Sequence, residues 1–257
     1  MDLSANPHAD DGAGPAPPAP CATGSDGFSA CHGRALRPLV ADAASDLVLI
    51  GGHALRAHGV LDRPCAGLGL ATDSQTPLPD ICRVAEAALA AAGLAVRVTD
   101  RQARTAGIAV RDPDCGHTTS VRLFKDALDP TTRSAARCGS AIVPVAGWKD
   151  TGGLKVRALL DRGAPQDYVD LHALSDRRTW PELENLGRRH APELDPDLLL
   201  ARLAMSARVP DDRFARLGLD EDGIGTLRVW LQGWVTDLSE RLAEERVLWR
   251  SMLPWLS

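Results

Sequence analysis

Residues 48–73, VLIGGHALRAHGVLDRPCAGLGLATD, decide the fold of this chain. The segment Leu47–Ile50 is short and wholly apolar and stops at a double glycine, which is typical of a strand buried on both faces. Residues His53–His58 then predict the first turns of a helix, with Gly59 as its C-terminal stop. The stretch therefore predicts a strand, a tight glycine turn and a helix in immediate succession.

The flanking sequence predicts strands first and helices afterwards. Apolar or alternating segments bounded by turn residues predict strands at Gly67–Ala71, Leu94–Val98, Gly107–Arg111, Ser120–Phe124 and Ala141–Val145. The third and fourth of these are expected to pair as a hairpin across DPDCGH. Helical spacing occurs at Leu36–Ala44, Asp80–Ala92, Thr151–Arg162, Tyr168–Leu174, Asp197–Ala207, Glu221–Arg241 and Ala243–Trp255.

These elements predict an α+β fold, in which a small mixed sheet with flanking helices precedes a C-terminal helical region. Residues 1–33 are rich in Pro, Gly, Ala and Ser and have almost no large apolar side chains, so we expect a disordered tail there. The sheet unit is expected over residues 34–150 and the helical region over residues 151–257.

The composition is that of an ordinary globular protein, with 257 residues, 44% hydrophobic and 25% charged. The net charge of -5 and the pI near 5.8 argue against broad nucleic-acid binding, because neutralising phosphates needs a basic surface. A local basic groove stays compatible with this charge, since net charge does not describe its distribution.

The six cysteines form no CxxC pair and show no regular disulfide spacing, so no metal site is predicted. There is no apolar run of about 18 residues, and the N-terminus lacks a basic start and an apolar segment. We therefore expect no membrane insertion, reduced thiols and a cytoplasmic location.

The apolar run, the motif GGHAL and Arg63 resemble the first motif of the AbiEii-type nucleotidyltransferase toxins. In that family an Asp-x-Asp pair follows the arginine, because two aspartates at i and i+2 on a strand point to one side and hold Mg²⁺. Counting on from Arg63 puts Gly67 and Gly69 at these two positions, and glycine cannot ligate a metal. The family's third carboxylate comes from a later strand, where this chain has Arg122 within SVRLF.

The segment 153–174, GLKVRALLDRGAPQDYVDLHAL, resembles the second motif of the same family. Gln166 stands where the family often has a basic residue. The resemblance implies a nucleotidyltransferase-like fold and a lysine that contacts nucleotide phosphates, although a solvated helix lysine stays an alternative. The two aspartates either take part in catalysis or cap and brace helices. The matching residues are Lys155, Arg162, Asp167 and Asp170.

The backbone N–H groups of Gly52 and His53 at the start of the expected helix predict an anion site. Arg63 and Lys155 could add positive charge to this site. His53 is placed at the mouth of the expected cleft as an acid or base, or has no catalytic part. Cys65 is a nucleophile or a small buried thiol. The candidate catalytic residues are His53, Arg63, Lys155 and Asp167; the candidate ligand-binding residues are Gly51, Gly52, Arg122 and Asp170; no residue is expected to bind metal.

Three hypotheses of function follow. The first is a divergent protein without metal-dependent nucleotidyl transfer, either a pseudoenzyme or an enzyme repurposed for small-molecule chemistry, with a nucleotide-like anionic ligand and no cofactor. The second is an active toxin that uses a nucleoside triphosphate and Mg²⁺ to modify RNA or protein, with carboxylates from Asp62, Asp73 or Asp167. The third is a protein that binds a partner through the C-terminal helices, which bear Trp230, Trp234, Trp249 and Trp255.

Overall fold

The computed structural model describes residues 28–41, 46–65, 67–139 and 141–252. The strands are β1 (Val48–Ile50), β2 (Gly67–Thr72), β3 (Ala95–Arg101), β4 (Thr105–Arg111), β5 (Thr118–Lys125), β6 (Ser134–Cys138) and β7 (Ala141–Val145). The helices are α1 (Ala30–Ala41), α2 (Gly51–Ala57), α3 (Leu78–Ala91), α4 (Trp148–Arg162), α5 (Pro165–His172), α6 (Trp180–His190), α7 (Pro196–Met205), α8 (Asp211–Ala215) and α9 (Glu221–Met252), with short 3₁₀ turns at Pro130–Thr132 and Ser206–Arg208.

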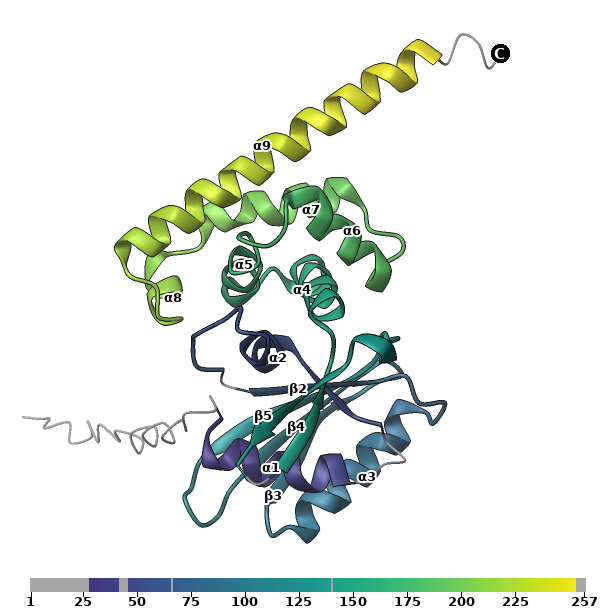
Figure 1. The fold of residues 1–257 in the computed structure, drawn as a ribbon, viewed down its shortest axis with the longest axis vertical. Helices are drawn as coiled ribbons and strands as arrows, with labels where there is room; N and C mark the ends of the chain where they lie inside the picture. The colour runs from purple at the N-terminus through teal and green to yellow at the C-terminus, as the bar shows by residue number, and fades with distance from the viewer. Residues whose placement is uncertain (1–27, 42–45, 66, 140, 253–257) are drawn as a thin grey trace, which may run out of the picture.

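The strands form one mixed sheet in the order β3-β4-β5-β2-β1-β7-β6. The central strand β2 runs antiparallel to β1 and parallel to β5. Helices α1 and α3 cover one face of this sheet, while α2 lies on the other, between the sheet and the helices α4 and α5 (Figure 1). This arrangement confirms the expected α+β fold with flanking helices and a C-terminal helical region.

Two large apolar cores and one small cluster hold the layers together. The first core lies between the sheet and the helices α1 and α3, and includes Leu36, Leu70 and Leu89. The second lies among the helices α4 to α9. The small third cluster is formed by Val48, Ile50, Ala71, Leu128 and Ala146. Because α2 follows β1 directly and gives Ala54 to the first core and Leu55 to the second, the segment quoted at the start joins the two halves of the molecule.

Several elements differ from the sequence-based expectation. Helix α1 begins at Ala30, so residues 30–33 belong to a helix and not to the expected tail. The edge strand β6 was missed because SAARC is largely exposed and has no apolar alternation. The helices α6 and α8 were also missed, since they are short and mostly polar. The two expected C-terminal helices are one helix, α9, because no glycine or proline interrupts residues 234–252.

The tryptophans of α9 have different surroundings. Trp234 is fully buried, and its indole Nε1 donates to Glu184 Oε1 over 2.9 Å. Trp249 is 63% exposed and lies in the half of α9 that runs on past the other helices (Figure 1). Trp255 lies outside the described residues. Burial thus removes Trp234 as a docking residue.

None of the described helices is both long and apolar enough to span a membrane.

A buried ionic cluster fastens the helical region to the end of β5. The Nδ1 atom of His190 in α6 lies 3.1 Å from Asp126 Oδ1, and its Nε2 atom lies 3.4 Å from Asp150 Oδ1 in α4. Asp126 also pairs with Arg157 of α4. Burial opposes the charged imidazole, but hydrogen bonds to the two aspartates outweigh it, so the pKa of His190 is raised. At Asp150, hydrogen bonds from His190 and from the backbone N–H of Asp129 outweigh burial, so the pKa of Asp150 is lowered.

We expect His190→Gln to destabilise the fold more at pH about 6 than at pH about 9. A raised folded-state pKa contributes stability that is fully present below the unfolded value and is lost as the pH rises through the folded value. Urea unfolding of both proteins across this range measures the difference. His172→Gln is the matched control. Because burial lowers the pKa of His172, the effect of this substitution on stability should change with pH in the opposite direction. A His190→Gln difference that does not change with pH would contradict the assignment.

Candidate functional site

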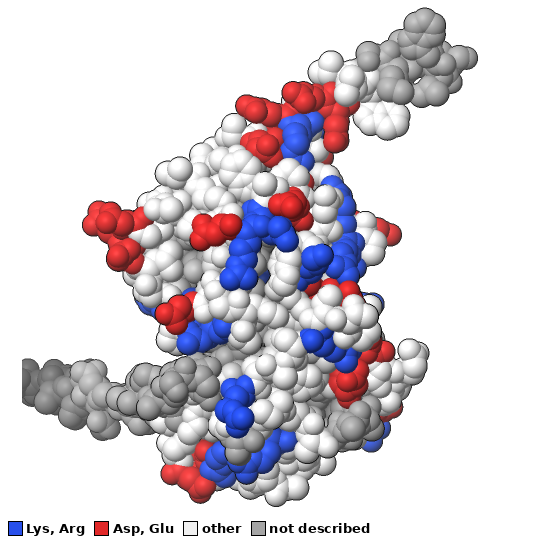
Figure 2. Space-filling view, in the orientation of Figure 1, with Lys and Arg blue, Asp and Glu red and all other residues white. Residues whose placement is uncertain are grey.

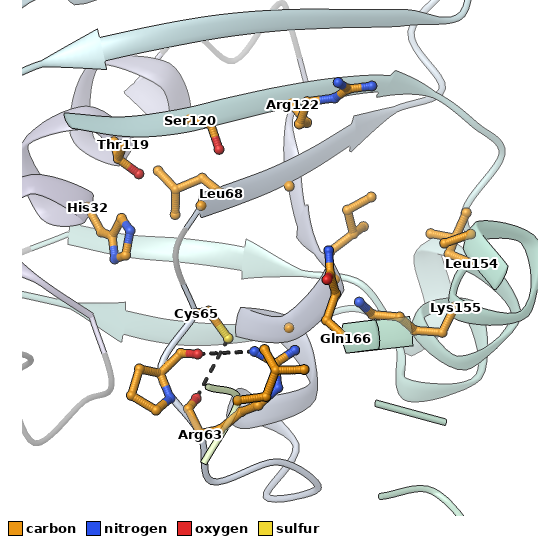
Figure 3. A pocket seen from close by; sticks show the side chains of 18 of the residues that line it. His32, Arg63, Cys65, Leu68, Thr119, Ser120, Arg122, Leu154, Lys155 and Gln166 are labelled. Carbon is orange, nitrogen blue, oxygen red and sulfur yellow. Dashed lines mark hydrogen bonds between the residues drawn. The ribbon is translucent and has the colours of Figure 1, made fainter. Parts of the chain in front are cut away.

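A cavity of about 1240 Å³ lies between the sheet and the helix α4. Its lining comes from β2 and β5, from the double glycine, from the loop around Cys65 and from α4, as the close-up shows (Figure 3). This is somewhat larger than the ~300–1,000 Å³ of typical small-molecule sites. The cavity therefore has room for a ligand of nucleotide size.

The glycines of β2 form the floor of the cavity. Side chains alternate along a strand, and Leu68 and Leu70 are buried in the first core. Gly67, Leu68 and Gly69 line the cavity. Any side chain at Gly67 would overlap the Oγ atom of Ser120 and lie 3.0 Å from its carbonyl oxygen. At Gly69 the nearest atom is Cγ1 of Ile50, 3.2 Å from an added Cβ. A side chain at Gly67 would therefore clash with Ser120, whereas one at Gly69 needs only a small shift of Ile50.

Arg122 lies beside the second of these glycines. The parallel pairing of β2 with β5 puts Arg122 in register with Gly69. The guanidinium is half exposed, lies 3.7 Å from the carboxylate of Asp100 and contacts the ring of Phe124. The sequence-based expectation of a cation next to this position agrees with the observed register.

A buried carboxylate gathers two further cations at the cavity wall. Asp170 of α5 is completely buried and accepts hydrogen bonds from Arg63 Nη2 at 2.5 Å and Arg63 Nε at 3.2 Å. Its other oxygen pairs with the Nζ atom of Lys155 in α4. Arg63 and Lys155 line the cavity, whereas Asp170 does not (Figure 3). The carboxylate of Asp170 therefore holds the charged groups of Arg63 and Lys155 at the wall of the cavity.

Asp167 has the geometry of a bracing residue. It is fully buried and accepts from Arg162 Nε at 2.8 Å and Arg162 Nη2 at 2.7 Å. It also accepts from the backbone N–H of Ala164, at the N-terminus of α5. The hydrogen bond to Asp167 is the main cause of the raised pKa of Arg162. Arg162 lines the cavity and Asp167 does not, so the capping alternative fits this geometry.

His53 does not lie at the mouth of the cleft, where the sequence placed it. Its side chain is 1% exposed, stacks on Phe28 at 4.4 Å between ring centroids, and meets the ring of His32 edge-on at 4.7 Å. The turn of α2 directs His53 toward the segment around α1. His32 lines the cavity instead (Figure 3). Sequence reasoning missed His32, because the first helix was expected to begin only at Leu36.

The double glycine does line the cavity. Gly51 has φ +75°, a left-handed conformation that glycine adopts without strain. An added Cβ at Gly52 would lie 2.6 Å from the Sγ atom of Cys65. Burial raises the pKa of Cys65 more than the neighbouring Arg63 lowers it, so the thiol form is favoured. This fits the small buried thiol better than the nucleophile.

The carboxylates that could replace an Asp-x-Asp pair lie elsewhere. Asp62 is fully exposed and pairs with Arg56, and Asp73 follows the end of β2 and lies 3.5 Å from Arg133. Neither lines the cavity. Among the described residues, the acidic side chains that do are Asp126, which is bound in the His190 cluster, and Asp161, which is exposed to solvent.

Positive charge on the surface is local. In the space-filling view, Lys and Arg side chains form several separate groups, over the helical region, at the waist and over the sheet, with Asp and Glu side chains among them (Figure 2). Separate groups of this kind are compatible with the net charge of -5.

No protein-family model and no curated protein matches the chain. Among solved structures, the chain is similar to JHP933 from Helicobacter pylori, with 17% identity and a TM-score of 0.45 over 84% of this chain and 94% of that one. It is also similar to MenT4, a nucleotidyltransferase toxin from Mycobacterium tuberculosis, with 18% identity and a TM-score of 0.48 over 80% of this chain and 90% of that one. At these values the similarity concerns the course of the chain alone, and the chemistry of the cavity has to be argued from its own residues.

Proposed function

We propose that this protein binds a nucleotide-like anionic ligand in the cavity through Arg63, Lys155 and Arg122, and does not perform metal-dependent nucleotidyl transfer. The observation that carries the proposal is the floor of the cavity, where Gly69 is in register with Arg122 and Gly67 is in register with Ser120. A magnesium ion needs carboxylate oxygens there, and a fixed cation in their place repels it.

The cations of the wall suit phosphate or carboxylate groups. Arg63 and Lys155 share a single buried carboxylate, so their charge exceeds that of their partner. Arginine offers paired N–H donors to an oxyanion, and lysine adds a compact positive charge. Glycine at the floor lets a ligand approach the backbone closely. These groups supply the positive charge that a metal ion otherwise brings to a nucleotide site.

We expect ATP and inorganic pyrophosphate to bind in the presence of EDTA, as measured by isothermal titration calorimetry. Replacing Lys155 by Gln is expected to weaken binding by about 10- to 150-fold, since one hydrogen bond to a charged group is worth about 1.5–3 kcal/mol. Lys149→Gln is the matched control, because Lys149 lies on the same helix but is exposed and outside the cavity.

Two results would contradict this proposal. The first is binding that appears only when Mg²⁺ is added, and the second is transfer of a labelled nucleotide to RNA or protein in the presence of Mg²⁺. Either result would favour an active toxin-like transferase whose carboxylates take an arrangement other than that of the glycine pair.

Adding a negative charge to the floor of the cavity is a second test of the site, complementary to the removal of a positive charge. Gly69→Asp is expected to fold, because the new Cβ would lie 3.2 Å from Cγ1 of Ile50, which has to yield slightly, and at an ordinary contact distance of 3.5 Å from its carbonyl oxygen. Its negative charge beside Arg122 should weaken anion binding by about 1–2 kcal/mol at an effective dielectric of about 20. Gly69→Asn has nearly the same shape without the charge and should bind almost as the original protein does. Equal binding by the two variants in calorimetry would place the ligand away from Arg122.

A further inference from the structure

We propose that Cys31, Cys115 and His117 form a zinc site whose fourth coordination position opens into the cavity. The three residues come from separate elements: Cys31 from the first turn of α1, and the other two from the turn between β4 and β5. One ligand atom from each lies within 4.8 Å of the others. The proposal goes beyond the anion site and does not depend on it.

The distances suit a metal better than a disulfide. The Sγ atoms of Cys31 and Cys115 lie 3.3 Å apart, well beyond the ~2.04 Å of an S–S bond. Two thiolates on one tetrahedral zinc, with Zn–S bonds of about 2.3 Å, lie about 3.8 Å apart. Since Cys115 is exposed and lies in a turn, a shift of well under an ångström reaches this geometry.

The turn that carries two of the ligands is held firmly against α1. Asp112 closes it, since its backbone N–H donates to His117 O and its carbonyl accepts from Gly116 N, both at 2.8 Å. Arg34 of α1 then binds Asp112 at 2.5 Å and Asp114 at 2.6 Å. These bonds join the turn to the helix that bears Cys31. Backbone hydrogen bonds within the turn and the ion pairs of Arg34 therefore hold the turn and α1 in place around the three ligand side chains.

The ligand set selects the class of metal. Two thiolates and one imidazole are soft and borderline donors that favour zinc over Mg²⁺ or Ca²⁺, which need oxygen ligands. Two thiolate charges also balance one divalent ion. Arg34 compensates the nearby carboxylate of Asp112, so the surroundings of the site carry little excess charge.

The place of the site in the cavity gives it an open position. Cys31 and His117 line the cavity, and so does His32, which lies on the side away from Lys155 in the close-up (Figure 3). Zinc with three protein ligands and one position for water or substrate is typical of reactive sites, whereas structural zinc has four protein ligands. A zinc ion here would therefore meet a ligand at a different end of the cavity from the Arg63 and Lys155 cations.

Cobalt titration of the reduced, metal-free protein tests the proposal. We expect one equivalent of Co²⁺ to bind with the near-ultraviolet absorption of cobalt thiolates, and Zn²⁺ to displace it. Cys115→Ser removes one of the two thiolates, so it should reduce this absorption and weaken binding by more than the ~10–100-fold that loss of an outer partner costs. Because Cys115 is exposed, this variant should keep the fold, which circular dichroism verifies. His117→Asn should weaken binding to a similar extent.

Cys65→Ser is the matched control, since Cys65 lines the cavity but lies outside the cluster, and it should bind Co²⁺ as the original protein does. Failure of the reduced protein to bind Co²⁺ or Zn²⁺ would overturn the proposal. So would unchanged binding by Cys115→Ser. A disulfide between Cys31 and Cys115 in the isolated protein, seen as a mass loss of two hydrogens, would assign the cysteines to redox chemistry if the reduced form still bound no metal.

Discussion

The buried carboxylate of Asp170 is the interaction on which the arrangement of the cavity depends. A carboxylate with no exposed surface is costly unless it is paired, and Asp170 is paired with both Arg63 and Lys155. These partners come from the loop after α2 and from α4, so one side chain of α5 ties three segments together. Removing one partner of such a buried group typically costs about 3–5 kcal/mol. Binding and folding are therefore linked here, because the cations of the wall are also structural partners.

The two cores leave the chemistry to a narrow zone between them. Apolar side chains fill the space between the sheet and the helices α1 and α3, and the space among the helices α4 to α9, and α2 contributes to both cores. The cavity lies over the side of β2 that carries Gly67 and Gly69, and Ile50 of the small third cluster also lines it. Since glycine has no side chain, β2 adds none to the cavity at these two positions.

Local patterns in the sequence predicted much of this architecture, but they did not predict contacts between residues far apart in the chain. The apolar run at Leu47–Ile50 and the alternation around Arg122 predicted the strands β1 and β5, and the pleat then decides which side chains share a face. The edge strand β6 could not be predicted, because an exposed edge needs no apolar pattern. The direction of His53 and the meeting of Cys31 with Cys115, 84 residues away, depend on how α1 docks, which no spacing reveals.

The two kinds of positively charged group proposed for this cavity are chemically distinct and spatially separated. At the floor and wall the charge is fixed on Arg122, Arg63 and Lys155, and hydrogen-bond donors of this type attract oxyanions at any metal concentration. At the opposite end, the thiolates of Cys31 and Cys115 prefer a soft ion and are poor ligands for Mg²⁺. A zinc ion bound by these thiolates would therefore not replace a magnesium ion that bridges phosphate groups above β2. If this cavity performs a reaction, its electrophile is therefore different in kind from the magnesium pair of a nucleotidyl transfer site.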